Sequence, residues 1–343
     1  MKTSDFDYTL PSELIAQIPL DKRDTSRLMV INRQNGGLQH NCFKDIVKFL
    51  RSGDVLVVNN SRVIPARLFG RKENTGAKVE ILLLRRTKDN RSWEVLAKPG
   101  KVLPVGTRVV LESSNSESVV AEITGILDEG VRVVTFDNEE HLGDIGHTPL
   151  PPYIQQQLSN SERYQTVYAS SHGSVAAPTA GLHFTMELLS ELSLMGVETL
   201  EVTLHIGLDT FRPVMVDNPA EHHIHSEYGV ITQEVATKIN TAKREGRRIV
   251  CVGTTSVRLL EYVANKAADV LVQPYSGWVD LLILPGFTFK VTDMMLTNFH
   301  LPKSTLLMMV SAFAGNKLIR EAYAEAIKQS YRFYSFGDAM LIL

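Results

Sequence analysis

The sequence predicts a two-domain α/β protein, in which a barrel-like α/β domain formed by residues 1–60 and 152–343 is interrupted by a small all-β barrel domain at residues 61–151. Three observations predict this arrangement. Residues 55–58 form an unbroken apolar run, typical of a strand that is buried on both faces. Short strand-like runs separated by Gly, Pro and Asn follow. After residue 152, helical and strand-like segments alternate, which favours a mostly parallel sheet or barrel covered by helices.

Length and composition set limits on the class of protein. A chain of 343 residues that is 44% hydrophobic can bury two cores. The longest apolar run, residues 306–314, is well short of the roughly 20 residues that a membrane span needs. Two cysteines, Cys42 and Cys251, are too few for a disulfide framework or an iron–sulfur cluster. We therefore expect a cytoplasmic protein that does not enter the membrane.

The N-terminal region contains a capping-box-like start at Ser12, and we expect a short helix at residues 14–18 and a strand at residues 28–31. A polar connection, residues 23–27, lies between them, and its composition favours a solvated turn. Asn59 and Asn60 end the apolar strand, with Arg62 close behind. Amides at the end of a buried strand can bind a ligand, although asparagine also ends strands for turn reasons alone.

The predicted insert has strands at residues 79–84, 93–97, 108–111, 119–123 and 131–136. Its charge is divided along the sequence: residues 62–108 hold twelve Lys/Arg against four Asp/Glu, and residues 109–150 hold one against nine. The basic half could meet phosphates, but a charged solvent-exposed face explains it as well. Since the whole chain has a net charge of −2, any contact with RNA must come from local clustering of this kind. The double proline in HTPLPPYI, residues 147–154, marks the end of the insert.

Beyond the insert, the α/β alternation predicts helices at residues 186–195, 233–244, 256–264, 305–313 and 318–330. The same alternation predicts strands at residues 197–205, 248–252 and 279–284. These elements complete the larger domain.

The stretch GSVAAPTAGLHFT, residues 173–185, is rich in small residues and contains one proline. Gly and Pro disfavour both a regular helix and a central strand, so we expect a tight loop that allows a ligand to approach the backbone closely. Thr185 is placed to cap the next helix. A Gly/Ala-rich surface turn would have the same composition.

A second candidate site is CVGTTSVR, residues 251–258, where a buried strand runs through a glycine into hydroxyl residues that open a helix. Such a helix N-terminus suits a carboxylate or phosphate, although capping alone explains Thr254 and Thr255. The sequence contains neither GxGxxG after a strand nor GxxxxGK[ST], which disfavours an ordinary nucleotide-binding fold.

Seven of the ten histidines lie from His172 onward. In HHIHSE, His223, His225 and Glu227 would share one face of an extended segment, which is also how a strand presents metal ligands. A metal-dependent hydrolase that uses residues 222–227 is therefore one alternative. A second alternative is a non-catalytic RNA-binding protein led by the insert.

Across almost its whole length the chain resembles the S-adenosylmethionine:tRNA ribosyltransferase-isomerases of queuosine biosynthesis. The resemblance lies in FDYTLPSELIAQ, SRLMV, GDVLVVNNSRVIPARL, YQTVYA, GSVAAPTAGLHFT, HIGLDTFRPV, VGTTSVR, TNFHLPKSTLLMMVSAFAG and YRFYSFGDAM. The chain departs from the family pattern at Asp209, where glycine is usual, and at Ile224, where methionine is common.

The resemblance implies transfer and isomerisation of the ribosyl part of S-adenosylmethionine onto a 7-aminomethyl-7-deazaguanine at the wobble position of tRNA. The substrates would be S-adenosylmethionine and a tRNA with a GUN anticodon; no cofactor or metal would be needed, and we expect a monomer. Such chemistry requires a base near C5′, a proton donor for the departing adenine and exclusion of water. The implied catalytic candidates are His183, His205, His225 and His300. The implied substrate-binding candidates are Asn59, Asn60, Arg62, Ala177, Thr179, Gly181, Thr254, Thr255, Ser256, Arg258 and Asn298.

Overall fold

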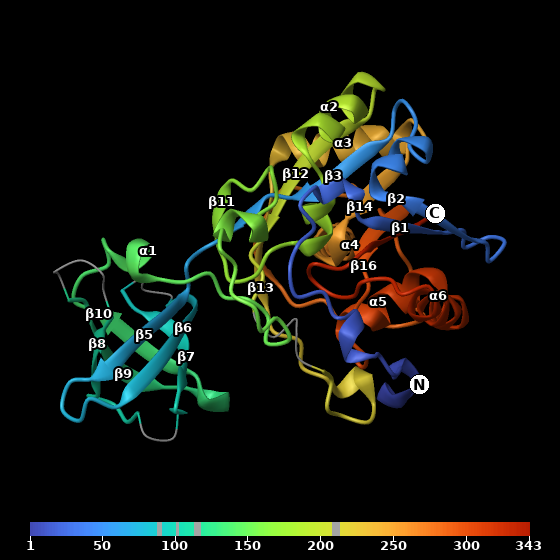
Figure 1. Ribbon diagram of the computed structural model, residues 1–343. Coiled ribbons are helices and arrows are strands. Elements are labelled where there is room, and N and C mark those ends of the chain that lie inside the picture. Colours follow the sequence, from blue (N-terminus) through green and yellow to red (C-terminus); the bar gives the residue numbers. More distant parts are fainter. Residues whose placement is uncertain (88–90, 101–102, 113–117, 208–212) are drawn as a thin grey trace. The chain divides into compact units, whose positions relative to one another are not determined.

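The computed structural model describes residues 1–87, 91–100, 103–112, 118–207 and 213–343 (Figure 1). The chain divides into two compact units. The larger unit consists of Met1–Arg62, Pro151–Ser171 and Ala177–Leu343, and the smaller one of Val63–Leu150 with His172–Ala176. The chain thus crosses into the smaller unit twice.

The larger unit is built on a nine-stranded sheet with the order β15-β13-β12-β3-β14-β16-β17-β1-β2. Its strands are β1 (Arg27–Ile31), β2 (Leu38–Cys42), β3 (Val55–Asn59), β12 (Glu198–Leu204), β13 (Glu227–Ile231), β14 (Ile249–Val252), β15 (Tyr275–Val279), β16 (Met294–Asn298) and β17 (Ala339–Ile342). Neighbouring strands β12, β3, β14 and β16 run parallel, so their carboxyl ends meet at one edge. The sheet is mixed rather than mostly parallel, because β13, β15, β17 and β2 each pair antiparallel with a neighbour.

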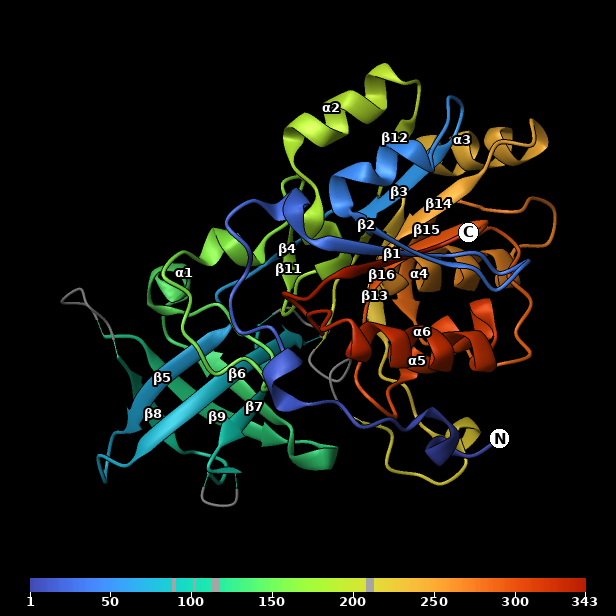
Figure 2. The same ribbon diagram turned by 45° about the vertical axis from the view of Figure 1, so that its right-hand side comes forward.

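Helices cover both faces of this sheet (Figure 2). They are α2 (Met186–Leu194), α3 (Gln233–Arg244), α4 (Gly253–Lys266), α5 (Thr305–Ala314) and α6 (Asn316–Lys328). Successive residues of a strand point to opposite faces. Val55 and Val57 accordingly join one core with α3 to α6, while Leu56 and Val58 join a second core with α2. The prediction that residues 55–58 are buried on both faces is confirmed.

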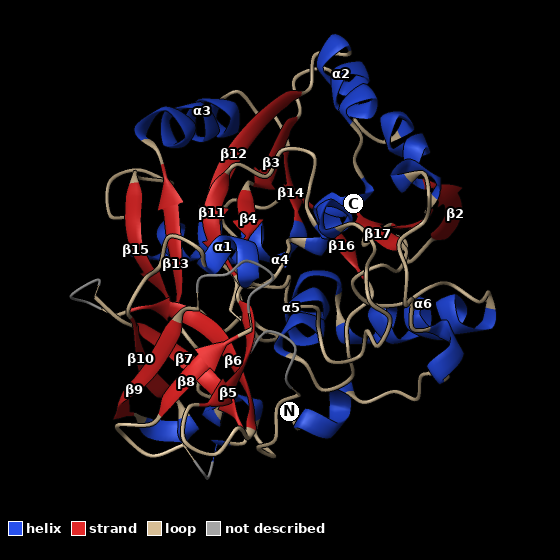
Figure 3. Cartoon of the chain, turned by 60° about the vertical axis from the view of Figure 1, so that its left-hand side comes forward, coloured by secondary structure: helices blue, strands red, loops and turns tan. Residues whose placement is uncertain are grey.

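The smaller unit is a closed six-stranded antiparallel barrel with the order β10-β7-β6-β5-β8-β9 (Figure 3). It contains β5 (Arg67–Lys72), β6 (Lys78–Arg86), β7 (Trp93–Lys98), β8 (Arg108–Leu111), β9 (Val120–Ile126), β10 (Arg132–Phe136) and the short helix α1 (Leu142–Ile145). Closure removes the unpaired strand edges. Strands β4 (Ser61–Val63) and β11 (Ser171–Ser174) form a separate two-stranded sheet. The predicted combination of an α/β domain with a small β barrel is confirmed.

Two predicted elements are wrong. The expected helix at residues 14–18 is a single 3₁₀ turn at Ser12–Leu14, because Pro19 disfavours helical backbone just before it. The expected strand at residues 279–284 is not formed. The strand in this region, β15, lies earlier in the chain and ends at Val279, where the last residue pair of its ladder with β13 joins Val279 to Glu227.

In the part of the chain that the structure describes, none of the helices has the length and apolar character needed to cross a membrane.

Candidate active site

The small-residue stretch ends in a 3₁₀ helix, Thr179–His183, followed by α2. Thr185 caps α2 as predicted, since its hydroxyl accepts a hydrogen bond from the Leu188 backbone N–H at 3.1 Å. Gly181 is required for space: a Cβ there would lie 2.0 Å from the Tyr168 hydroxyl oxygen and 2.8 Å from Cγ2 of Thr166. Any larger residue at position 181 would therefore force Tyr168, Thr166 or the segment itself to shift.

A pocket lies at the carboxyl edge of the parallel strands, where α/β sheets usually bind their ligands. β14 runs directly into α4 there, and β16 ends there at Asn298. The pocket is lined by Tyr153, residues 177–180, Ile206, residues 253–255, residues 297–301, Leu306, Tyr334 and Ser335. The structure thus brings together six of the candidate residues: Ala177, Thr179, Thr254, Thr255, Asn298 and His300.

Two buried polar atoms of the pocket residues have no hydrogen-bond partner among the described residues: Oγ1 of Thr255 and Oδ1 of Asn298. The orientation of the Asn298 amide is fixed by its nitrogen, because Nδ2 donates a hydrogen bond to the Tyr334 carbonyl at 3.0 Å. Tyr334 itself has φ +69°, in the left-handed region that non-glycine residues rarely adopt. Both oxygens belong to residues that line the pocket, so each can form a hydrogen bond with a molecule bound there.

His300 lines the same pocket and is 8% exposed. Its Nε2 lies 2.7 Å from the Thr297 hydroxyl, which fixes the ring. Burial lowers the pKa of His300 to about 3, so the imidazole is neutral near pH 7. A neutral ring can accept or donate one hydrogen bond without a change in charge.

His183 lies behind the pocket and not on its lining. Its Nδ1 is 2.7 Å from the Ser26 hydroxyl, its Nε2 is 3.4 Å from Nδ2 of Asn298, and its ring stacks on Phe43. Because Asn298 Nδ2 must donate, Nε2 accepts and the proton sits on Nδ1, which then donates to Ser26. Burial first, and then the charges of Arg332 and Arg23, lower the pKa of His183 to about 3. His183 therefore contacts the pocket residue Asn298 without lining the pocket itself.

The expectation of a solvated turn at residues 23–27 is wrong in part. Ser26 is 2% exposed and donates to the Arg23 carbonyl at 3.2 Å while it accepts from His183. Ser26 is polar although it is buried, because its hydrogen-bond partner His183 lies far away in the chain.

The other two histidine candidates lie outside the pocket lining. His205 follows β12, next to the lining residue Ile206. Its Nδ1 is buried without a partner in the described structure, and burial lowers its pKa. His225 is exposed, and its backbone carbonyl accepts a hydrogen bond from Arg258 at 3.4 Å.

The remaining candidates have partners within the larger unit. Asn59 bridges to Leu204 by two hydrogen bonds of 2.9 and 3.0 Å, which hold β3 against β12. Asn60 bonds to Glu201 and Thr203, and Arg62 pairs with Glu162. The Ser256 hydroxyl donates to the Val252 carbonyl at 2.8 Å. These contacts give each residue a role in the fold, and substrate binding by them stays a prediction.

The acidic end of HHIHSE is engaged elsewhere. Glu227 is 6% exposed, forms an ion pair with Arg258 at 3.0 Å, and accepts from the Gly207 N–H at 2.9 Å. No cluster of three or more His, Cys, Asp or Glu residues suited to a metal ion occurs among the residues that the structure describes. The departure at Asp209 lies outside the described residues.

Sequence reasoning missed several pocket residues, namely Tyr153, Ile206, Thr297, Leu301, Leu306, Tyr334 and Ser335. Tyr334 and Ser335 belong to YRFYSFGDAM, and Thr297 adjoins Asn298, so the motifs contained them. No chemical signal marked these residues, because an aromatic residue in an apolar context is ordinarily part of a core.

Comparison with known proteins agrees with this arrangement. The chain matches the family described as "Queuosine biosynthesis protein" over residues 3–342. It is 54% identical to S-adenosylmethionine:tRNA ribosyltransferase-isomerase of Dehalococcoides mccartyi strain CBDB1 and 55% identical to the protein of that name from Carboxydothermus hydrogenoformans, with all of each chain covered. A crystal structure of S-adenosylmethionine tRNA ribosyltransferase from Thermotoga maritima is 39% identical, with a TM-score of 0.58 over 99% of this chain and 100% of that one. The chain belongs to the queuosine biosynthesis protein family.

Proposed function

We propose that this protein is an S-adenosylmethionine:tRNA ribosyltransferase-isomerase. It transfers and isomerises the ribosyl moiety of S-adenosylmethionine onto 7-aminomethyl-7-deazaguanine at the tRNA wobble position, and releases adenine and methionine. The observation that carries this proposal is the pocket at the carboxyl edge of β14 and β16, in which Thr255 Oγ1 and Asn298 Oδ1 have no partner among the described residues. Family membership over the full length supports the same reaction.

In this proposal the pocket residues have separate roles in binding and catalysis. The first residues of α4, Gly253 to Thr255, present the positive end of a helix dipole to the carboxylate of the methionyl group. Asn298 Oδ1 accepts a hydrogen bond from the substrate. His300 offers a neutral imidazole to the ribosyl region, where the sulfonium acidifies the C5′ protons. The apolar lining, with Ile206, Leu301 and Leu306, excludes water from reactive intermediates.

We further propose that the tRNA carries a GUN anticodon, that S-adenosylmethionine is a substrate with no additional cofactor, and that the enzyme is a cytoplasmic monomer.

The decisive experiment incubates the protein with S-adenosylmethionine and tRNA that carries the deazaguanine, and measures free adenine. Adenine should appear in step with modified tRNA. Adenine release without modified tRNA, or no release at all, would reject the proposal.

The basic half of the insert offers a separate test of RNA contact. Arg85 pairs with Glu94 at 2.8 Å, and Arg86 pairs with Glu139 and stacks on Trp93 at 4.4 Å. If these arginines touch tRNA, Arg85→Glu with Arg86→Glu should raise the KM for tRNA and flatten its salt dependence, while S-adenosylmethionine binding stays unchanged. An unaltered salt slope would assign the two arginines to a structural, solvent-exposed face.

A further inference from the structure

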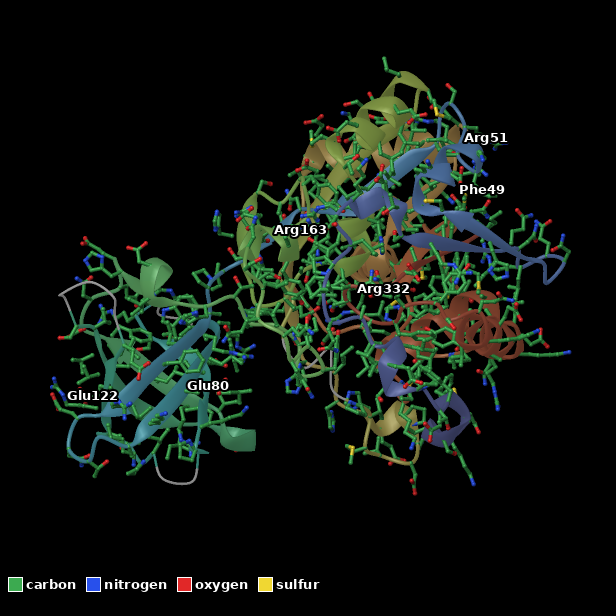
Figure 4. All side chains as sticks on the ribbon, in the orientation of Figure 1. Phe49, Arg51, Glu80, Glu122, Arg163 and Arg332 are labelled. Atoms are coloured by element: carbon green, nitrogen blue, oxygen red, sulfur yellow. The ribbon has the colours of Figure 1, made fainter. Side chains whose placement is uncertain are left out.

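Two half-buried arginines line a second, small cavity beside His183 in the larger unit, and a third, Arg332, donates to the carbonyl of Ile18, next to the lining residue Pro19. Arg23 and Arg163 line this cavity of about 30 Å³ together with Ser26, His183 and residues 335–337. Ser335 also lines the active-site pocket, so the two cavities adjoin. Arg332 is near enough to act on the charge of the His183 ring. Figure 4 labels Arg163 and Arg332.

The hydrogen bonds that these arginines donate in the described structure go to backbone carbonyls and not to carboxylates. Arg23 donates to the carbonyls of Leu182 and Glu162 at 3.2 and 3.0 Å, and Arg163 donates to the carbonyl of Asp21 at 3.2 Å. The guanidinium of Arg332 likewise donates to a backbone carbonyl, that of Ile18. Carbonyl oxygens satisfy N–H groups but carry no net charge.

Two carboxylates lie near enough to act on these charges: Glu162 favours the charged form of Arg23, and Asp338 favours the charged form of Arg332. Glu162 forms an ion pair with Arg62. Asp338 accepts from the backbone N–H groups of Arg27 and Arg332, each at 2.8 Å. Among the described residues, none of Arg23, Arg163 and Arg332 has a carboxylate within ion-pair distance. Three arginines therefore face two carboxylates, one of which also pairs with Arg62, and the surroundings of the cavity keep an excess of positive charge.

Two of the guanidinium N–H groups also lack a partner. Nε of Arg163 and Nη1 of Arg332 are buried without a hydrogen bond in the described structure. The pKa of Arg23 is lowered by burial first and by the like charge of Arg163 second. Unpaired buried donors and mutually repelling cations both cost free energy in the empty protein. An oxyanion bound here would remove both costs.

We propose that Arg23, Arg163 and Arg332 bind a backbone phosphate of the RNA substrate, close to the nucleotide that enters the active-site pocket. This inference rests on the proposed function, because it takes RNA as the substrate. Guanidinium groups match phosphate oxygens with two parallel N–H donors. The cavity has no room for a nucleobase, so the charged group alone enters it. S-adenosylmethionine fits this cavity poorly, since its sulfonium would be repelled by three cations.

The test measures how the Kd of an anticodon stem–loop RNA depends on salt. Each phosphate contact on single-stranded RNA contributes about 0.7 to the slope of log Kd against log salt concentration. Because the three arginines share one phosphate, Arg163→Gln and Arg332→Gln should each lower that slope by at most about 0.7, and Arg163→Lys should keep the wild-type slope because it keeps the charge. Lys317→Gln is the matched control, since its side chain is 92% exposed on α6. Thermal unfolding of every variant checks that the fold survives.

Several outcomes would overturn the inference. If the Gln variants keep the wild-type slope, or if Lys317→Gln loses as much as they do, these arginines do not hold a phosphate. A raised KM for S-adenosylmethionine with an unchanged RNA slope would instead indicate a carboxylate site. Wild-type protein that binds the RNA but releases no adenine would reject the proposed function, while the salt slopes would still decide the role of the arginines.

Discussion

His300→Ala is expected to lower turnover by about 10²–10⁴-fold, the usual contribution of a positioned acid or base, with a much smaller change in the KM for S-adenosylmethionine. Of the four candidate histidines, His300 is the one that lines the pocket. Its ring is fixed by the 2.7 Å contact with Thr297, so replacement by alanine removes a positioned group and opens space without blocking the site. Steady-state adenine release, with each substrate varied in turn, separates kcat from KM.

Matched variants make this prediction specific. Thr297→Val removes the partner of His300 Nε2 and should lower kcat less than His300→Ala does, because the imidazole remains. His223→Ala, at an exposed position in HHIHSE, should leave turnover unchanged. Wild-type turnover in His300→Ala would contradict the assignment. Loss of turnover in His223→Ala would revive the metal-site alternative.

An element of the fold could be predicted from the sequence when the residues that determine it are neighbours in the chain. Residues 55–58 showed their burial directly, and α3 begins and ends at the residues that were predicted for it, 233 and 244. Local sequence could not show the second crossing at residues 172–176, because that segment joins the smaller unit through contacts distant in sequence. Strand β17, at residues 339–342, went unpredicted for a related reason: a short apolar run near a chain end becomes a strand only when β16 and β1 pair with it.

Pocket residues could be predicted from the sequence where polar side chains stand next to residues that indicate the end of a strand or the start of a helix. Thr254 and Thr255 follow a strand and a glycine, and Asn298 and His300 share one short motif; all four line the pocket. Asn59 shows the limit of this reasoning, because a buried amide at a strand end has the same sequence whether it binds a ligand, the neighbouring backbone or both; the structure shows its bonds to Leu204. The role of Ser26 depended on a partner 157 residues away, which no local pattern could reveal.

The two buried histidines should also make the larger unit sensitive to acid. Burial lowers the pKa of His183 and of His300 from 6.5 to about 3. The unfolded chain therefore binds more protons than the folded one between about pH 6.5 and pH 3. The stability that the neutral rings contribute is fully present above about pH 6.5 and is lost as the pH falls below it. Each histidine should cost about 1.4 kcal/mol per pH unit, or about 2 kcal/mol at pH 5.

The measurement compares urea unfolding at pH 7 and pH 5 for the wild type and for His300→Gln, which cannot titrate in this range. Both proteins carry Trp93→Phe, so that the fluorescence of Trp278, the other of the two tryptophans, reports on the larger unit. Asp338 has a pKa raised by burial and acts in the opposite direction, but its contribution cancels between the two proteins. The wild type should lose about 2 kcal/mol more than His300→Gln on going to pH 5. Equal losses would mean that burial does not lower the pKa of His300 in the folded protein, and the acid sensitivity would then have to be assigned to other groups.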